Sequence, residues 1–83
     1  MENQIDILQT SDIKTSAYLL SAGVSLVRII KNNPQKIVFC FPQNQEVKRV
    51  LQLYWTNKAQ VNPRNLFDNF DYLKDLIHRD YDI

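Results

Sequence analysis

The chain has 83 residues, of which 45% are hydrophobic and 23% charged, and its formal net charge at pH 7 is +1. This length predicts one α+β domain over residues 1–83, with no room for a second core. The near-neutral charge supplies no long-range attraction to phosphate or to anionic lipid, so any basic surface must come from local clustering. No apolar run approaches the ~20 residues needed to cross a membrane, and the N-terminus lacks the pattern of a secretory signal.

The N-terminal part predicts a short strand followed by a helix. Ile5–Leu8 offers an edge strand, and Thr10 and Ser11 are good N-cap residues, with Asp12 beside them at the positive end of a helix dipole. Gly23 can take the left-handed position that ends a helix. The helix between these signals has an apolar stripe made of Ile13, Ala17, Leu19 and Leu20.

Residues 24–42 predict a β-hairpin around which the rest of the chain is organised. Its expected strands are Val24–Lys31 and Lys36–Phe41, and its turn is residues 32–35, which contain Asn and Pro. Alternation places Ile37, Phe39 and Phe41 on one face of the second strand and Val38 and Cys40 on the other. A lone hairpin is marginal in water, so helices must cover at least one of these faces.

The C-terminal half predicts two further helices. Asn44 and its neighbours offer a cap for a helix over Gln45–Asn57, with an apolar stripe. Asn62 followed by Pro63 combines an N-cap with proline at the first helical position, so a third helix begins at Pro63. Its apolar face consists of Leu66, Phe70, Leu73, Ile77 and Tyr81. The expected fold is therefore a hairpin, with a possible third edge strand, packed by three α-helices in the order (β)αββαα.

Several short patterns recur in an order that resembles a known family. They are Thr10-Ser11-Asp12, Ala17-Tyr18-Leu19-Leu20 with Gly23, Phe39-Cys40-Phe41, and Val61-Asn62-Pro63 followed by Leu66-Phe67. Together they resemble a small uncharacterised domain family of microbial genomes and mobile elements, with Asn62 where the family pattern has an acid. The resemblance covers nearly the whole chain and implies a single α/β domain. It supplies no catalytic or binding residues.

The residues give little support to catalysis or to a bound cofactor. Cys40 and His78 are the only soft or borderline metal ligands, whereas a closed zinc site needs four ligands. Cys40 lies in the most apolar strand, where burial disfavours a thiolate, and we read it as structural. Gly23 is the sole glycine, which excludes a P-loop. We therefore expect no enzyme, no cofactor, no metal site and no evident small-molecule substrate.

Two polar features of the last helix have ordinary structural interpretations. His78 is expected to be a solvated histidine near Asp75 and Asp82. The acidic run Asp68, Asp71, Asp75, Asp80 and Asp82 is more typical of a solvated helix face than of a cation site.

The single cysteine also precludes an intramolecular disulfide, which favours a reducing, cytoplasmic setting.

The first functional hypothesis is a non-enzymatic interaction module that binds a protein partner or a second copy of itself. A hairpin that is apolar on both sides, in so short a chain, has more faces than helices to cover them. The expected contact residues are Val27, Ile29, Val38 and Cys40, with Trp55 as a second anchor.

The second hypothesis is a nucleic-acid-binding accessory protein, which the net charge favours less. A half-exposed tryptophan flanked by cations could stack on a base while the cations bind phosphate. The residues would be Lys48, Arg49, Gln52, Trp55, Lys58 and Arg64. The alternative for Trp55 is that it packs under the third helix and closes the core.

Overall fold

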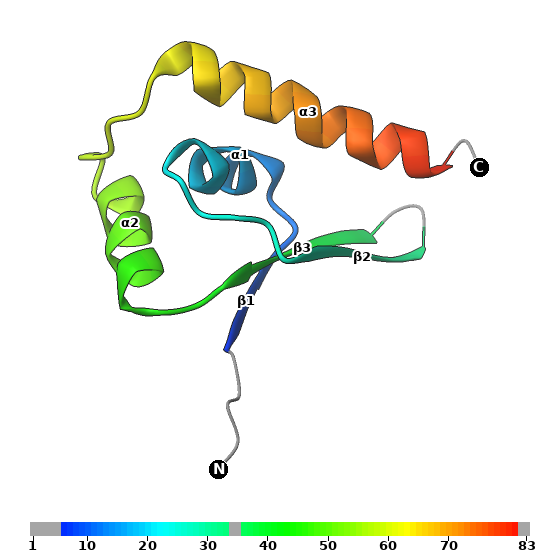
Figure 1. The fold of residues 1–83 in the computed structure, drawn as a ribbon, viewed down its shortest axis with the longest axis horizontal. Helices are drawn as coiled ribbons and strands as arrows, with labels where there is room; N and C mark the ends of the chain where they lie inside the picture. The colour runs from blue at the N-terminus through cyan, green and yellow to red at the C-terminus, as the bar shows by residue number, and fades with distance from the viewer. Residues whose placement is uncertain (1–5, 34–35, 82–83) are drawn as a thin grey trace.

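The computed structural model describes residues 6–33 and 36–81, in which three strands and three helices follow one another in the order βαββαα (Figure 1). This confirms the α+β fold class and the third strand. The elements are β1 (Ile7–Thr10), α1 (Ile13–Ser21), β2 (Arg28–Asn33), β3 (Lys36–Pro42), α2 (Gln45–Trp55) and α3 (Pro63–Tyr81).

The sheet has the strand order β1-β3-β2, so the second hairpin strand is its centre. Leu8 on β1 pairs with Phe41, and Ile29 on β2 pairs with Phe39. Both outer strands run antiparallel to β3 and are therefore parallel to each other, with α1 connecting them across the strand between. This is a split β-α-β arrangement, which explains why β1 can pair with a strand some thirty residues further along the chain.

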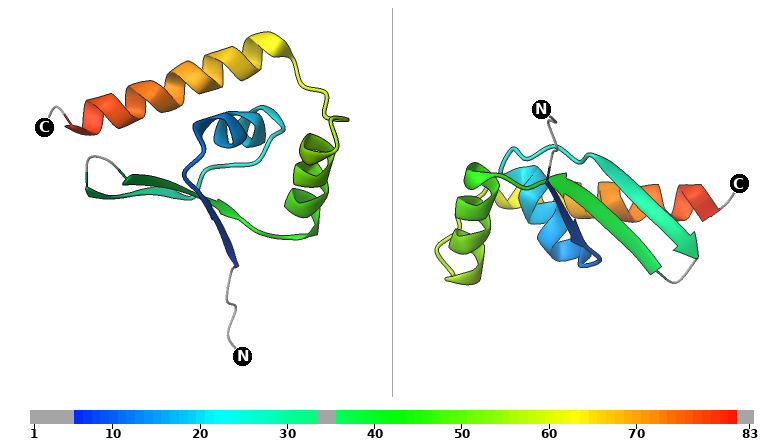
Figure 2. Two further views of the ribbon diagram at one scale, coloured as in Figure 1. Left: turned by 180° about the vertical axis from the view of Figure 1, so that it is seen from behind. Right: turned by 90° about the horizontal axis from the view of Figure 1, so that it is seen from below.

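The helices lie on one side of the sheet, as Figures 1 and 2 show. Phe39 and Phe41 on β3 are almost fully buried on that side, together with Leu19 from α1 and Leu73 from α3. α2 lies beside α1, at the end of the sheet where β3 leaves it (Figure 1). The view from below shows the opposite face of the sheet with no helix in front of it (Figure 2, right).

α1 is the central helix of this layer. Four consecutive residues, 16–19, are buried, which requires neighbours on more than one side of the helix. Asp12, not Thr10 or Ser11, is the N-cap residue, and Thr10 supports it because its hydroxyl accepts a hydrogen bond from the Asp12 N–H. Gly23 adopts the predicted left-handed conformation, with φ 96°.

The boundaries of all three strands differ from the sequence prediction. The first hairpin strand ends at Asn33 instead of Lys31 and so includes two residues of the predicted turn, and the second ends at Pro42 instead of Phe41. The first hairpin strand starts at Arg28 rather than Val24, because the Val24 N–H bonds back to the Leu19 carbonyl and completes the end of α1. The N-terminal strand is Ile7–Thr10 rather than Ile5–Leu8. Ile5 and two predicted turn residues, 34 and 35, lie outside the described residues.

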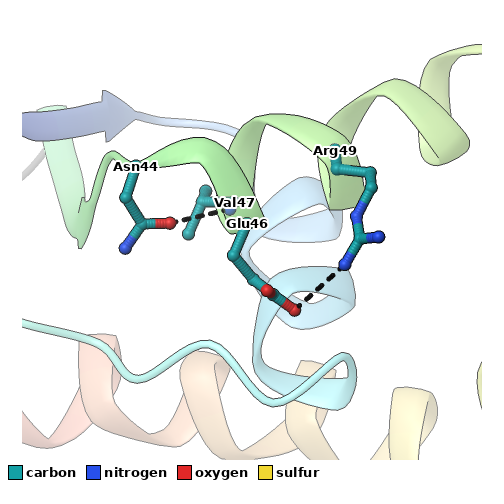
Figure 3. Close-up of polar contacts among 4 residues, drawn as sticks. All are labelled: Asn44, Glu46, Val47 and Arg49. Atoms are coloured by element: carbon teal, nitrogen blue, oxygen red, sulfur yellow. Dashed lines mark hydrogen bonds and ion pairs between the residues drawn. The ribbon is translucent and has the colours of Figure 1, made fainter.

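α2 and α3 begin at the predicted residues. The Asn44 side chain accepts the Val47 N–H at 2.9 Å and so caps α2 (Figure 3). Asn62 accepts the N–H groups of Arg64 and Asn65 at the start of α3. α2 ends at Trp55 instead of Asn57, because Asn57 takes the left-handed conformation, with φ 62°. On α3, Leu73 is fully buried and Leu66, Phe70 and Ile77 are partly buried, as the apolar face predicts.

Candidate interaction surfaces

In the part of the chain that the structure describes, the sheet face that points away from the helices has no helix in front of it (Figure 2, right). We call it the open sheet face. Register places Ile30 directly opposite Val38, and Cys40 between Gln9 and Arg28. By strand alternation it consists of Ile7, Gln9, Arg28, Ile30, Lys36, Val38, Cys40 and Pro42.

This face has half-buried apolar side chains in its middle and polar ones around them. Ile30 and Val38 are half-buried, whereas Gln9, Arg28 and Lys36 are exposed. A half-buried aliphatic pair on an uncovered sheet with cations at its border is typical of a contact surface and not of a core.

The structure separates the four sheet residues that we predicted to act together. Val38 and Cys40 do lie on the open sheet face, but Ile29 pairs with Phe39 and therefore points toward the helices. Val27 precedes β2 and is 46% exposed outside this face. Cys40 is fully buried, so it cannot serve as a direct contact. Ile30 replaces Ile29, because the strand alternation fixes which of two neighbours faces outward.

Trp55 is 69% exposed and does not pack under α3. It borders a hollow of about 460 Å³, to which Lys48 and Gln52 from the same face of α2 contribute. We call this the tryptophan hollow. Its other lining residues are Leu8, Gln43, Leu51 and Thr56. Three of the six residues predicted for nucleic acid therefore lie together.

The other three predicted cationic residues lie elsewhere. Arg49 reaches Glu46 at 3.6 Å, an exposed pair one turn apart on α2 (Figure 3). Lys58 follows the end of α2, and its N–H closes that helix on the Leu53 carbonyl. Arg64 lies in the first turn of α3. None of the three lines the tryptophan hollow, so Lys48 is its cationic lining residue among the described parts of the chain.

A third candidate surface, which the sequence did not suggest, is a concavity among the three helices. We call it the aromatic groove. It has a volume of about 430 Å³ and is lined by Lys14, Ala17, Tyr18, Tyr54, Ala59, Val61, Leu66, Phe67 and Phe70. Its residues come from α1, α2, α3 and the connection between α2 and α3, which have no common spacing in the sequence. Only the fold brings them together.

The described residues show no arrangement typical of a metal site. Across 6–33 and 36–81, no three His, Cys, Asp or Glu side chains gather where they could hold a metal ion. Asp68, Asp71, Asp75 and His78 are exposed on α3, and Asp82 lies outside the described residues. None of the described helices is both long and apolar enough to cross a membrane.

Comparison with known proteins gives one finding. A family model described as a domain of unknown function, DUF5659, matches residues 6–79. No curated protein and no solved structure matches the chain. The match covers both hairpin strands, all but the last residues of α3, and every residue of the open sheet face, the tryptophan hollow and the aromatic groove.

Proposed function

Since the chain belongs to the DUF5659 family, whose function is unknown, we propose from its surfaces that it is a non-enzymatic interaction module that self-associates through the open sheet face. The observation that carries this proposal is the one-sided packing of the sheet. Phe39 and Phe41 are buried by helices, whereas Ile30 and Val38 on the other face have no described element across them.

Two copies of the open sheet face can pair by a two-fold axis, which places the same patch on both partners. Ile30 and Val38 would form the apolar centre of the contact. Arg28 and Lys36 would remain at the border, where cations stay solvated and repel one another least. The expected complex is therefore weak and strengthens with salt, because salt screens the like charges.

Sedimentation equilibrium across micromolar concentrations tests this proposal. We expect a monomer–dimer equilibrium that the double change Ile30→Thr, Val38→Thr weakens at least about tenfold, since threonine keeps strand propensity but loses apolar surface. Val27→Thr is the matched control, because Val27 is exposed outside this face. A strict monomer, or equal weakening by the control, contradicts self-association.

A second function, single-stranded nucleic-acid binding, is supported by the exposure of Trp55. Its ring is accessible for stacking, Lys48 can bind a phosphate, and Gln52 can bond a base edge. We propose this as the alternative, in an accessory protein of a microbial or mobile-element system that works in a reducing, cytoplasmic setting.

Trp55 is the sole tryptophan, so its fluorescence reports on the alternative directly. Mixed-sequence single strands should quench it at low salt, and Lys48→Glu should weaken binding several-fold while Arg49→Glu does not, because Arg49 lies outside the tryptophan hollow. An unchanged spectrum at saturating strand concentration, or equal effects of the two variants, excludes the tryptophan hollow as a nucleic-acid site.

A further inference from the structure

The aromatic groove has the size and lining of a small-molecule site. Its volume of about 430 Å³ lies within the range of ~300–1,000 Å³ that is typical of ligand pockets. Eight of its nine lining residues are apolar or aromatic, and the ninth is Lys14. Ala17 and Ala59 leave the space open where larger side chains would fill it. The groove therefore favours a mostly apolar occupant.

The wall of the groove is held in place without a ligand. The Tyr18 ring stacks on Tyr54 with ring centres 4.7 Å apart, and the Tyr18 hydroxyl donates a hydrogen bond of 2.8 Å to the Val50 carbonyl. These contacts join α1 to α2 beside the groove. A ligand would then bind to a surface that is already ordered, which lowers the entropic cost of binding.

Phe67 adds exposed apolar surface at the groove's edge. Its side chain is 64% exposed although it lines the groove together with Phe70. An aromatic ring left in water on the border of a concave apolar surface can bury more area only when something occupies that surface. Phe67 therefore supplies part of the binding energy for an occupant and contributes little to the fold alone.

The charged group that lines the groove is the Lys14 ammonium, and Tyr54 adds a phenolic hydroxyl. The Tyr18 hydroxyl already bonds to the Val50 carbonyl, and among residues 6–33 and 36–81 no acidic side chain lines the groove. The neighbouring carboxylate, Asp12, caps α1, where it accepts hydrogen bonds from the Lys14 backbone N–H and the Thr15 hydroxyl. The Thr15 hydrogen bond is the largest of the causes that lower the pKa of Asp12, and the Lys14 charge is the smallest. Lys14 also lies in the first turn of α1, where a cation does not stabilise the helix.

We propose that the aromatic groove binds an apolar carboxylate, with its hydrocarbon body against Tyr54, Phe67 and Phe70 and its carboxylate beside Lys14. The groove lies among the helices, whereas the open sheet face lies on the other side of the sheet. The two proposals are therefore independent, and either can fail without the other.

Calorimetric titration with three probes tests the ligand class. Decanoate, below its micelle concentration, represents an aliphatic acid, 2-naphthoate an aromatic acid, and decylammonium the opposite charge. We expect saturable binding of at least one acid, about two- to fivefold tighter than decylammonium, which is the effect of one exposed charge pair. The acid that binds more tightly, decanoate or 2-naphthoate, identifies the ligand class as aliphatic or aromatic. No saturable binding of either acid, or equal binding of decylammonium, overturns the proposal.

Matched variants test the location. Lys14→Met should weaken the acid several-fold and abolish its preference over decylammonium, whereas Lys48→Met, in the tryptophan hollow, should change neither. Phe67→Ala should weaken binding about tenfold, whereas Tyr72→Ala, an exposed aromatic of α3 outside the groove, should not.

All four substitutions change exposed side chains, and circular dichroism verifies the fold of each variant. Equal effects within either pair would show that the acid binds elsewhere and would overturn the proposal. A fifth variant, Ala59→Leu, fills the groove from the connection between α2 and α3 and should abolish binding. Full binding to that variant also contradicts the proposed site.

Discussion

Asp12 shows how a single side chain positions the start of the central helix. Its carboxylate accepts the Thr15 hydroxyl at 2.7 Å and the Lys14 N–H at 3.2 Å, while its own N–H donates to the Thr10 hydroxyl. The hydrogen bond from the Thr15 hydroxyl is the main reason that the pKa of Asp12 lies below its ordinary value. The charged form is therefore the one that stabilises the folded state.

Replacing Asp12 by alanine should lower the free energy of unfolding by about 1 kcal/mol at pH 7, the usual effect of losing an N-cap. Because the folded-state pKa is lowered, this contribution is present above the unfolded pKa of about 3.9 and is lost as pH falls through the folded pKa. Urea unfolding of both proteins from pH 7 downward should show the difference shrinking in acid. Asp71→Ala, an exposed change on α3, is the control. A pH-independent difference would show that the charge of Asp12 does not matter.

At the scale of elements, the starts of α2 and α3 and the glycine after α1 were predictable because single residues determine them, whereas the N-cap of α1 and the end of α2 differ from the prediction. Asn62 with Pro63, Asn44, and Gly23 each perform the local role that their chemistry predicts. Strand boundaries that depend on which partner each backbone N–H finds could not be predicted to the exact residue. Val24 looks like a strand residue, yet its N–H is used at the end of α1, and the chain reaches the sheet edge only at Arg28.

The candidate surfaces also differ in how far the sequence could predict them. Lys48, Gln52 and Trp55 share a helical face, so their proximity follows from spacing alone. The choice of Ile30 over Ile29 for the open sheet face needed the pairing register, which the hairpin sequence left open. The aromatic groove could not be predicted, because its residues come from four segments and only tertiary packing brings them together.

The attachment of α2 to the rest of the molecule depends strongly on Tyr18. Besides the buried Val47 and Leu51, the described contacts of this helix include the Tyr18–Tyr54 stack and the hydrogen bond to Val50. Tyr18→Phe keeps the ring and removes only that bond, so we expect a loss of about 1 kcal/mol. Hydrogen exchange should speed up in α2 more than in α3, since local opening follows local contacts. Uniform acceleration would show that α2 does not open separately.

Tyr18→Phe should also change how the stability of the protein depends on pH in the alkaline range. Burial raises the pKa of Tyr18, and the neighbouring Tyr54 raises it further. A raised folded-state pKa gives stability that is fully present below the unfolded value of about 10 and is lost as pH rises through the folded pKa. Thermal unfolding of the parent protein should therefore decline at high pH more steeply than that of Tyr18→Phe. Parallel curves would show that another group titrates.

At the scale of the whole molecule, one layer of helices and one sheet share a single core. α3 is bound to α1 by apolar packing and by a hydrogen bond that the Asn69 amide donates to the Ser21 hydroxyl at 2.9 Å. On α3, Leu73 is fully buried in the hydrophobic core, while its neighbour Tyr72 is 48% exposed. Comparing an alanine substitution at each of these adjacent residues therefore separates the loss of core packing from the effect of the substitution on the helix itself.

Leu73→Ala should destabilise the protein by about 2–5 kcal/mol, through lost burial and a residual cavity. A chain of this length has a total stability of about 4–12 kcal/mol, so the variant should lie near the limit of folding. Tyr72→Ala should cost less than about 1 kcal/mol because much of its ring is already in water. Urea titrations followed by far-UV circular dichroism and by Trp55 fluorescence compare the two variants. Trp55 lies on α2, so its fluorescence and the circular dichroism signal report on different parts of the molecule. If the two transitions coincide, the protein unfolds as one cooperative core. If the helix signal is lost before the fluorescence changes, α3 unfolds separately and the single-core description is wrong.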